Sequence, residues 1–108
     1  MTDPAPKHDV FQAIADHTRR RMLKMLADEE MSIAAIVGCF PITRTAVNKH
    51  LQVLADAGLV TSHKIGRETR YKLQPEPLIV LKQWLSFYER YWDDKLLALQ
   101  KYVEGDDV

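Results

Sequence analysis

The side chains between Thr43 and Lys49 are of the types that hydrogen-bond to nucleic-acid bases and phosphates. Arg44 can bond the N7 and O6 atoms of guanine together, and Asn48 can bond N6 and N7 of adenine in the same paired way. Thr43 and Thr45 carry hydroxyls that can bond a phosphate or a base. With Lys49, these residues form a candidate recognition surface.

A helix must hold these side chains on one side. The apolar positions recur at i, i+4 and i+7: Val47, Leu51 and Leu54. This spacing predicts an amphipathic helix from about Arg44 to Ala57, with Thr43 as its N-cap and Gly58 as its C-cap. The major groove of B-DNA, ~12 Å wide, admits one such helix. The apolar stripe would seat the helix, and its N-terminus favours a nearby phosphate.

A basic hairpin is predicted after this helix. We expect strands at about Leu59–Ile65 and Thr69–Leu73, joined by a turn at Gly66-Arg67-Glu68. Three basic side chains lie at or beside the tip: Lys64, Arg67 and Arg70. Because Arg67 stands in the turn, it is well placed to follow a phosphate backbone or to enter a minor groove. The hairpin is therefore the second predicted contact with nucleic acid.

The charge is unevenly distributed, although the formal net charge is zero. Residues 43–72 include six basic and two acidic residues, whereas residues 75–108 include four basic and seven acidic ones. The middle third is thus the basic part, as a nucleic-acid contact requires. An ordinary solvated surface and a protein-binding surface are the alternatives, since polar helix faces and basic hairpins need no ligand.

Three shorter helices are predicted before this region, at about Asp9–Ala15, His17–Asp28 and Ile33–Cys39. Their inward residues are Val10, Phe11, Ile14 and Ala15, then Met22, Leu23 and Leu26, then Ile33, Ile36 and Val37. Phe40-Pro41-Ile42 ends the third helix. This order predicts a mainly helical α+β fold of the winged helix-turn-helix type. We expect a single domain over residues 1–108, with the helix-turn-helix at about 33–57 and the wing at about 59–73.

The last predicted helix, about Leu78–Val103 within the segment 76–103, has more apolar positions than one face can bury. One set recurs at spacings of three or four: Leu78, Leu81, Leu85, Tyr88, Trp92, Leu96, Leu99 and Val103. A second set consists of Trp84, Phe87, Tyr91 and Leu97. The surplus predicts a homodimer interface. Its expected residues are Phe11, Leu85, Tyr88, Trp92, Leu96 and Leu99. The alternative is that both sets pack on the chain's own core.

Other features restrict the class of protein. The sequence has no apolar run of about 18 residues, no signal-peptide pattern, and a single cysteine. We therefore expect a cytoplasmic protein with no membrane partner. The adjacent carboxylates Asp93 and Asp94 diverge by ~100° on a helix and do not converge on one site. There is no Gly-rich phosphate loop either, so we expect neither enzyme activity nor a cofactor.

Several segments, in the correct order, resemble the ArsR-type family of winged-helix repressors. AIADHTRRRML at 13–23 resembles its opening signature, although His17 replaces the usual proline. TAVNKHL at 45–51 with AGLV at 57–60 resembles its recognition helix, and GR at 66–67 with YKL at 71–73 resembles its wing. The resemblance implies a homodimeric repressor that binds an inverted-repeat operator in double-stranded DNA. It also implies dimer contacts from the first and last helices.

The metal-binding positions of that family lack their usual ligands here. The segment that matches its C-x-C motif reads Ser32-Ile33-Ala34, and the final helix has no histidine. We therefore predict no metal site. Cys39 is expected to be a partly buried structural thiol rather than a redox or metal site. His50, where the family often has histidine, is expected to contact DNA or to be structural rather than to bind a metal. The other histidines are expected at the surface: His8, His17 and His63.

The final helix narrows the resemblance. Trp84-Leu85 and Tyr91-Trp92-Asp93, with Leu96, Leu99 and Tyr102-Val103, look like the metal-independent, SdpR-like branch of autorepressors. An aromatic-lined ligand pocket at the interface is the alternative to simple packing of these side chains. The effector, the operator and the regulated genes are left open.

Overall fold

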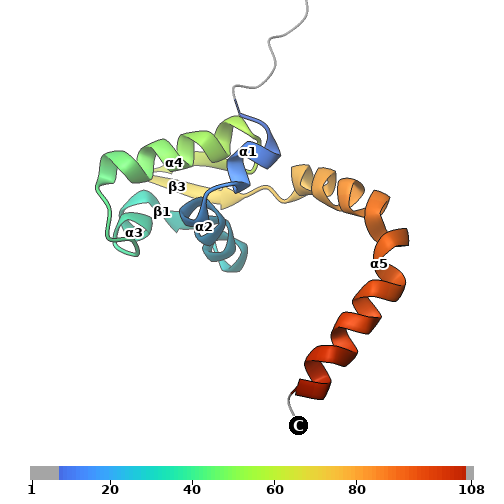
Figure 1. Cartoon of the computed structure of the whole chain (residues 1–108). Coiled ribbons are helices and arrows are strands. Elements are labelled where there is room, and N and C mark those ends of the chain that lie inside the picture. The colour runs from blue at the N-terminus through green and yellow to red at the C-terminus, as the bar shows by residue number, and fades with distance from the viewer. Residues whose placement is uncertain (1–7, 107–108) are drawn as a thin grey trace, which may run out of the picture. The chain divides into compact units, whose positions relative to one another are not determined.

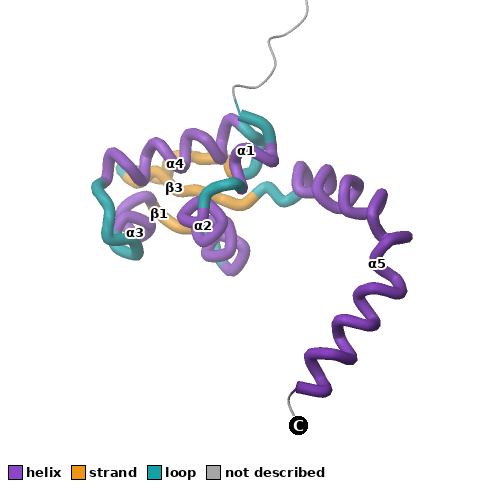
Figure 2. The backbone as a smooth tube through the Cα atoms, in the orientation of Figure 1, coloured by secondary structure: helices purple, strands orange, loops and turns teal. Residues whose placement is uncertain are grey.

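The computed structural model describes residues 8–106, and Figures 1 and 2 show its helices and strands. The helices are α1 (Val10–Ile14), α2 (His17–Asp28), α3 (Ile33–Val37), α4 (Arg44–Asp56) and α5 (Ile79–Asp106), with a 3-10 turn at Glu76–Leu78. The strands are β1 (Met31–Ser32), β2 (Val60–Ile65) and β3 (Glu68–Leu73). Two compact units result, one ending at Leu78 and one beginning at Ile79.

Side-chain caps determine where the first two helices begin. Asp9 accepts a hydrogen bond from the Gln12 backbone at 2.8 Å, and the Gln12 side chain accepts one from the Asp9 backbone at 2.9 Å. This capping box starts α1. Asp16 caps α2 by accepting from the Arg19 backbone at 3.0 Å. The buried side of α2 is as predicted: Met22, Leu23 and Leu26.

The sheet of the first unit has three antiparallel strands in the order β1-β3-β2, one more than the sequence predicted. The additional strand β1 pairs with β3 and places Met31 opposite Tyr71. Two residues are too few to show an alternating pattern, so the sequence does not indicate this strand. Strands β2 and β3 form the predicted hairpin, which closes with Ile65 opposite Glu68. Gly66 turns the chain there with a φ of 63°, a conformation that glycine adopts without strain.

The core of the first unit lies where α2, α3 and α4 meet the sheet. Its largest fully buried side chains are Met22, Ile36, Val47, Leu51, Leu54, Leu59 and Val60. The apolar stripe predicted for α1 is wrong in part: α1 buries Val10 and Ala13, whereas Phe11 is 39% exposed and Ala15 is exposed. Residues three apart share a helix face, which brings Ala13 rather than Phe11 beside Val10.

The third helix is shorter than predicted. Ser32 starts α3 by accepting from the Ala35 backbone at 3.1 Å, and the helix ends at Val37 instead of Cys39. Residues 38 and 39 form a turn at the surface. Cys39 is therefore exposed, and the expectation of a partly buried thiol is wrong.

The second unit is the helix α5, 28 residues long, which continues past the predicted end at Val103. Tyr88 is half-buried at the centre of an aromatic cluster: its ring stacks on Trp92 at 6.3 Å and meets Phe87 edge-on at 5.0 Å. The exposed large apolar side chains of α5 are Ile79, Val80, Trp84, Leu85, Phe87, Tyr91, Trp92, Leu96, Leu97, Leu99, Tyr102 and Val103. Neither this helix nor any other in residues 8–106 combines the length and apolar character needed to cross a bilayer.

Candidate nucleic-acid interface

Helix α4 separates its side chains into a buried side and an exposed side. Thr43 starts the helix by accepting a hydrogen bond through Oγ1 from the Ala46 backbone at 3.1 Å. Val47, Leu51 and Leu54 are each 0% exposed, so burial holds the helix against the core. Four predicted contact residues are exposed: Arg44, Thr45, Asn48 and Lys49. Positions three and four apart lie on one side of a helix. Thr45, Asn48 and Lys49 therefore form a continuous polar strip on α4.

Gln52 extends this strip and was missed in the sequence. It is exposed and follows Asn48 by one helical turn, and its Nε2 donates to Asp56 Oδ1 at 3.0 Å. A glutamine amide bonds adenine in the same paired way as asparagine. The spacing of four residues from Asn48 was the available signal, but Gln52 lies beyond the N-terminal half of the helix, where the predicted contact residues are concentrated.

The basic side chains of the hairpin have two different environments. Lys64 and Arg67 are exposed, and Arg67 follows Gly66 in the turn. Arg70 instead forms two ion pairs, from Nε to Glu30 Oε1 at 3.2 Å and from Nη1 to Glu68 Oε2 at 3.1 Å. The charge of Arg70 is therefore largely balanced within the chain, whereas Arg67 projects from the turn into solvent.

The outer face of the hairpin is also tied to the segment before β1. His63 and Arg70 are directly opposite in the β2–β3 register, and both contact one oxygen of Glu30. The distance from His63 Nε2 to Glu30 Oε1 is 2.9 Å. Glu30 thus anchors both strands of the hairpin. His63 lies at the surface, as predicted, but it has an acidic partner that the sequence did not reveal.

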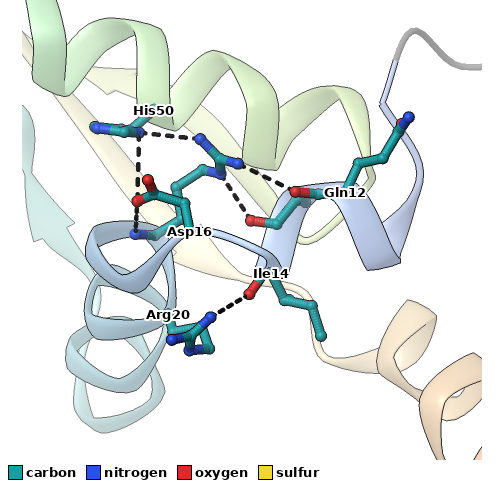
Figure 3. Close-up of polar contacts among 7 residues, drawn as sticks. Gln12, Ile14, Asp16, Arg20 and His50 are labelled. Carbon is teal, nitrogen blue, oxygen red and sulfur yellow. Dashed lines mark hydrogen bonds and ion pairs between the residues drawn. The ribbon is translucent and has the colours of Figure 1, made fainter.

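His50 lies outside the polar strip of α4, beside the start of α2. Its Nδ1 is 3.2 Å from Arg19 Nη1 and 3.9 Å from Asp16 Oδ2 (Figure 3). Partial burial raises the pKa of Asp16, but the backbone hydrogen bond from Arg19, together with the charge of the Arg19 guanidinium, lowers this pKa by more. The net pKa of Asp16 is below its ordinary value. These contacts favour the structural alternative for His50 over a DNA contact.

In the part of the chain that the structure describes, no three histidine, cysteine, aspartate or glutamate side chains come together as a metal-binding group. Instead, histidines meet single carboxylates at separate places. His8 is 3.6 Å from Asp56, and His63 meets a different carboxylate, that of Glu30. A structural zinc site takes four ligands, so these pairs are not such sites.

Comparison with known proteins places this geometry among transcription regulators. A helix-turn-helix domain family matches residues 14–63. HTH-type transcriptional regulator Rv2034 of Mycobacterium tuberculosis is 34% identical over 100 residues, which cover 91% of this chain and 91% of the relative. Transcriptional repressor SdpR of Bacillus subtilis is 29% identical over 89 residues, 82% of this chain and 99% of its own. The solved ArsR-like transcriptional regulator from Rhodococcus sp. RHA1 matches with a TM-score of 0.70 and 34% identity, over 89% of this chain and 88% of its own.

The fold and the exposed polar strip together define a winged helix-turn-helix protein. The chain belongs to the ArsR family of winged-helix transcriptional regulators. This confirms the family, the fold class and the regulatory function predicted from the sequence, and SdpR is among the relatives. The names of the relatives point to regulators, not to enzymes.

Proposed function

We propose that this chain is a homodimeric repressor that reads an inverted-repeat operator with α4 and contacts the flanking DNA backbone with the β2–β3 wing. One observation carries the proposal: the polar strip of α4 is exposed, while the opposite side of the same helix is fully buried. A firmly seated helix with outward polar groups suits the major groove of B-DNA.

The exposed contact residues of α4 differ in the roles that we propose for them. Arg44 stands at the helix N-terminus, where it bonds a guanine edge or a phosphate that the helix dipole also attracts. Asn48 pairs with an adenine, and such a paired contact discriminates against a wrong base by about 1–3 kcal/mol. Thr45 and Lys49 bond adjacent phosphates or bases and so fix the register of the helix on the duplex.

The wing supplies contacts that do not depend on base sequence. Arg67 and Lys64 are exposed beside the turn, and each phosphate that they neutralise releases counterions from DNA. Arg70 keeps its carboxylate partners and orients the hairpin. His50 supports α4 from the side rather than contacting DNA.

A second copy of the chain covers the apolar side of α5. Twelve large apolar side chains of this helix are exposed in one chain, which is unusual for a protein that functions as a monomer. A two-fold dimer presents two copies of α4 to half-sites about 34–36 Å apart, which explains an inverted-repeat operator. The proposed interface includes Phe11, Leu85, Tyr88, Trp92, Leu96 and Leu99. Since a repressor acts where the chromosome is, we place the protein in the cytoplasm.

Selection from a pool of random-sequence duplexes tests this proposal. The purified chain should enrich an inverted repeat whose half-sites lie ~10 base pairs apart, centre to centre. Footprinting should show protection of both halves. The matched control is the double variant Arg44→Ala and Asn48→Ala, which should enrich no sequence. A wild-type selection that yields no sequence, or one without two-fold symmetry, contradicts the proposal.

A further inference from the structure

One guanidinium group joins three helices of the first unit. Arg19 in α2 donates through Nε to the Ala13 carbonyl at 2.7 Å and through Nη2 to the Gln12 carbonyl at 3.1 Å. Both carbonyls belong to α1. The Nη1 of the same side chain reaches His50 Nδ1 in α4 at 3.2 Å. The dashed contacts in Figure 3 accordingly run from the end of α1 across to His50.

This contact determines which form of His50 the fold selects. An arginine guanidinium has donors and no acceptor, so His50 Nδ1 must accept and carries no proton while the bond holds. A neutral imidazole then has its proton on Nε2. Figure 3 shows that this second nitrogen points away from Asp16. The ring is therefore held in one tautomer by a residue outside the helix that carries it.

We propose that Arg19 is a positioning residue for the recognition helix and that it acts through His50. The inference rests on the proposed DNA-reading role of α4. Burial of Val47, Leu51 and Leu54 seats α4, but apolar contacts are non-directional. The Arg19–His50 bond is directional, and it fixes the flank of α4 relative to the corner between α1 and α2. Base readout needs that precision because paired hydrogen bonds tolerate errors of only about 0.5 Å.

The start of α2 is built to hold Arg19 itself in place. Asp16 accepts from the Arg19 backbone at 3.0 Å, and its carboxylate is also 3.9 Å from His50. The backbone and the side chain of Arg19 are therefore both fixed, the first by the helix cap and the second by two α1 carbonyls. Loss of the guanidinium would leave His50 Nδ1 without its donor.

The next residue provides a matched control. Arg20 also ties α2 to α1, through a single bond from Nη1 to the Ile14 carbonyl at 2.7 Å. Figure 3 places Arg20 on the side of the corner away from His50. Arg20→Met therefore weakens the same corner without removing the contact to α4. A difference between Arg19→Met and Arg20→Met isolates the link to the recognition helix from general loss of stability.

The first experiment measures the affinity of the full chain for two duplexes of equal length. One duplex has the sequence that the wild type enriches from a random pool, and the other has an unselected sequence. Arg19→Met should lower the ratio of the two affinities by about tenfold, whereas Arg20→Met should change it by less than about twofold. An unchanged ratio in Arg19→Met, or equal changes in the two variants, overturns the inference.

A double-mutant cycle tests whether Arg19 acts through His50. His50→Leu should lower the affinity ratio to a similar extent, and Arg19→Met should add no further loss in that background. His50→Asn, which retains an acceptor close to the position of Nδ1, should keep a ratio nearer to the wild type. Additive losses, or identical ratios for His50→Leu and His50→Asn, contradict a role through His50.

Nitrogen NMR reports which nitrogen of the His50 imidazole carries the proton, and a merely structural role for Arg19 would leave this signal unchanged. In the DNA-free wild type, His50 should show the Nε2–H tautomer, and Arg19→Met should convert this signal to a mixture of forms. An unchanged His50 signal in a folded Arg19→Met chain overturns the inference. A wild type that enriches no sequence overturns the proposed function together with this inference. A selective wild type with an equally selective Arg19→Met variant overturns the inference alone.

Discussion

The unit that ends at Leu78 and the helix α5 place their apolar side chains in opposite environments. In the first unit, Leu51 is 0% exposed, and the large apolar side chains exposed among its described residues are Phe11 and Ile65. In α5, Leu99 is 57% exposed, and eleven other large apolar side chains are exposed with it. The first unit therefore completes its core within one chain, whereas α5 has an apolar surface suited to a second copy.

The largest expected effect breaks the proposed interface of α5. Trp92→Asp would bury an uncompensated carboxylate between two copies, at a cost of about 3–5 kcal/mol, so the dimer should dissociate. Analytical ultracentrifugation should show a dimeric wild type and a monomeric variant. Gln83→Asp adds the same charge at another exposed position of α5 and should remain dimeric. A Trp92→Asp variant that stays dimeric contradicts the assignment of this interface.

A pair of leucine substitutions sharpens the contrast between the two regions. Leu51→Ala should lower the free energy of unfolding by about 2–5 kcal/mol, because it creates a cavity in a core that is already closed. Leu99→Ala should instead raise the dimer dissociation constant. Denaturant unfolding and sedimentation equilibrium measure the two quantities. If Leu51→Ala weakens association more than Leu99→Ala does, the division of roles is wrong.

A smaller effect, on DNA affinity, is expected in the wing, where an ion-paired arginine and a solvent-exposed arginine lie close together. Arg67→Ala should weaken binding to all duplexes and reduce the slope of log affinity against log salt by about one. Arg70→Ala should reduce this slope less, because two carboxylates already balance its charge. Titrations at several salt concentrations measure both slopes. An equal reduction of the slope for the two variants would contradict the conclusion that the charge of Arg70 is balanced within the chain while that of Arg67 is not.

The smallest expected effect concerns the corner between α1 and α2. The pKa of Asp16 is lowered in the folded chain from its ordinary value of 3.8, so its ionised carboxylate contributes stability at pH values above that ordinary pKa. This contribution is lost as the pH falls through the folded pKa. The difference in unfolding free energy between wild type and Asp16→Asn should therefore shrink between pH 7 and pH 3. A constant difference over that range contradicts a role for the charge.

Local patterns in the sequence were sufficient to predict helix α4 and the β2–β3 hairpin. Val47, Leu51 and Leu54 define the buried side of α4 by their spacing alone, and Thr43 marks its start. The hairpin followed from its alternating residues and from Gly66 in the turn. Such features depend on neighbours within one helix or hairpin, which the sequence displays directly.

Contacts between distant segments could not be predicted in this way. The Arg19–His50 bond joins residues 31 positions apart, and Glu30 meets Arg70 only because β1 pairs with β3. Nothing in the local pattern distinguishes the balanced charge of Arg70 from the exposed charge of Arg67. The burial of Ala13 in place of Phe11 likewise depends on how α1 packs against its neighbours.

The central claim, that the exposed strip of α4 reads base identity, is tested most directly with Asn48→Ala. The affinity of this variant should be measured for the duplex that the wild type selects and for an unselected duplex of equal length. We predict a loss of about 1–3 kcal/mol on the selected duplex and little change on the other. Equal losses on both duplexes would contradict base readout by α4.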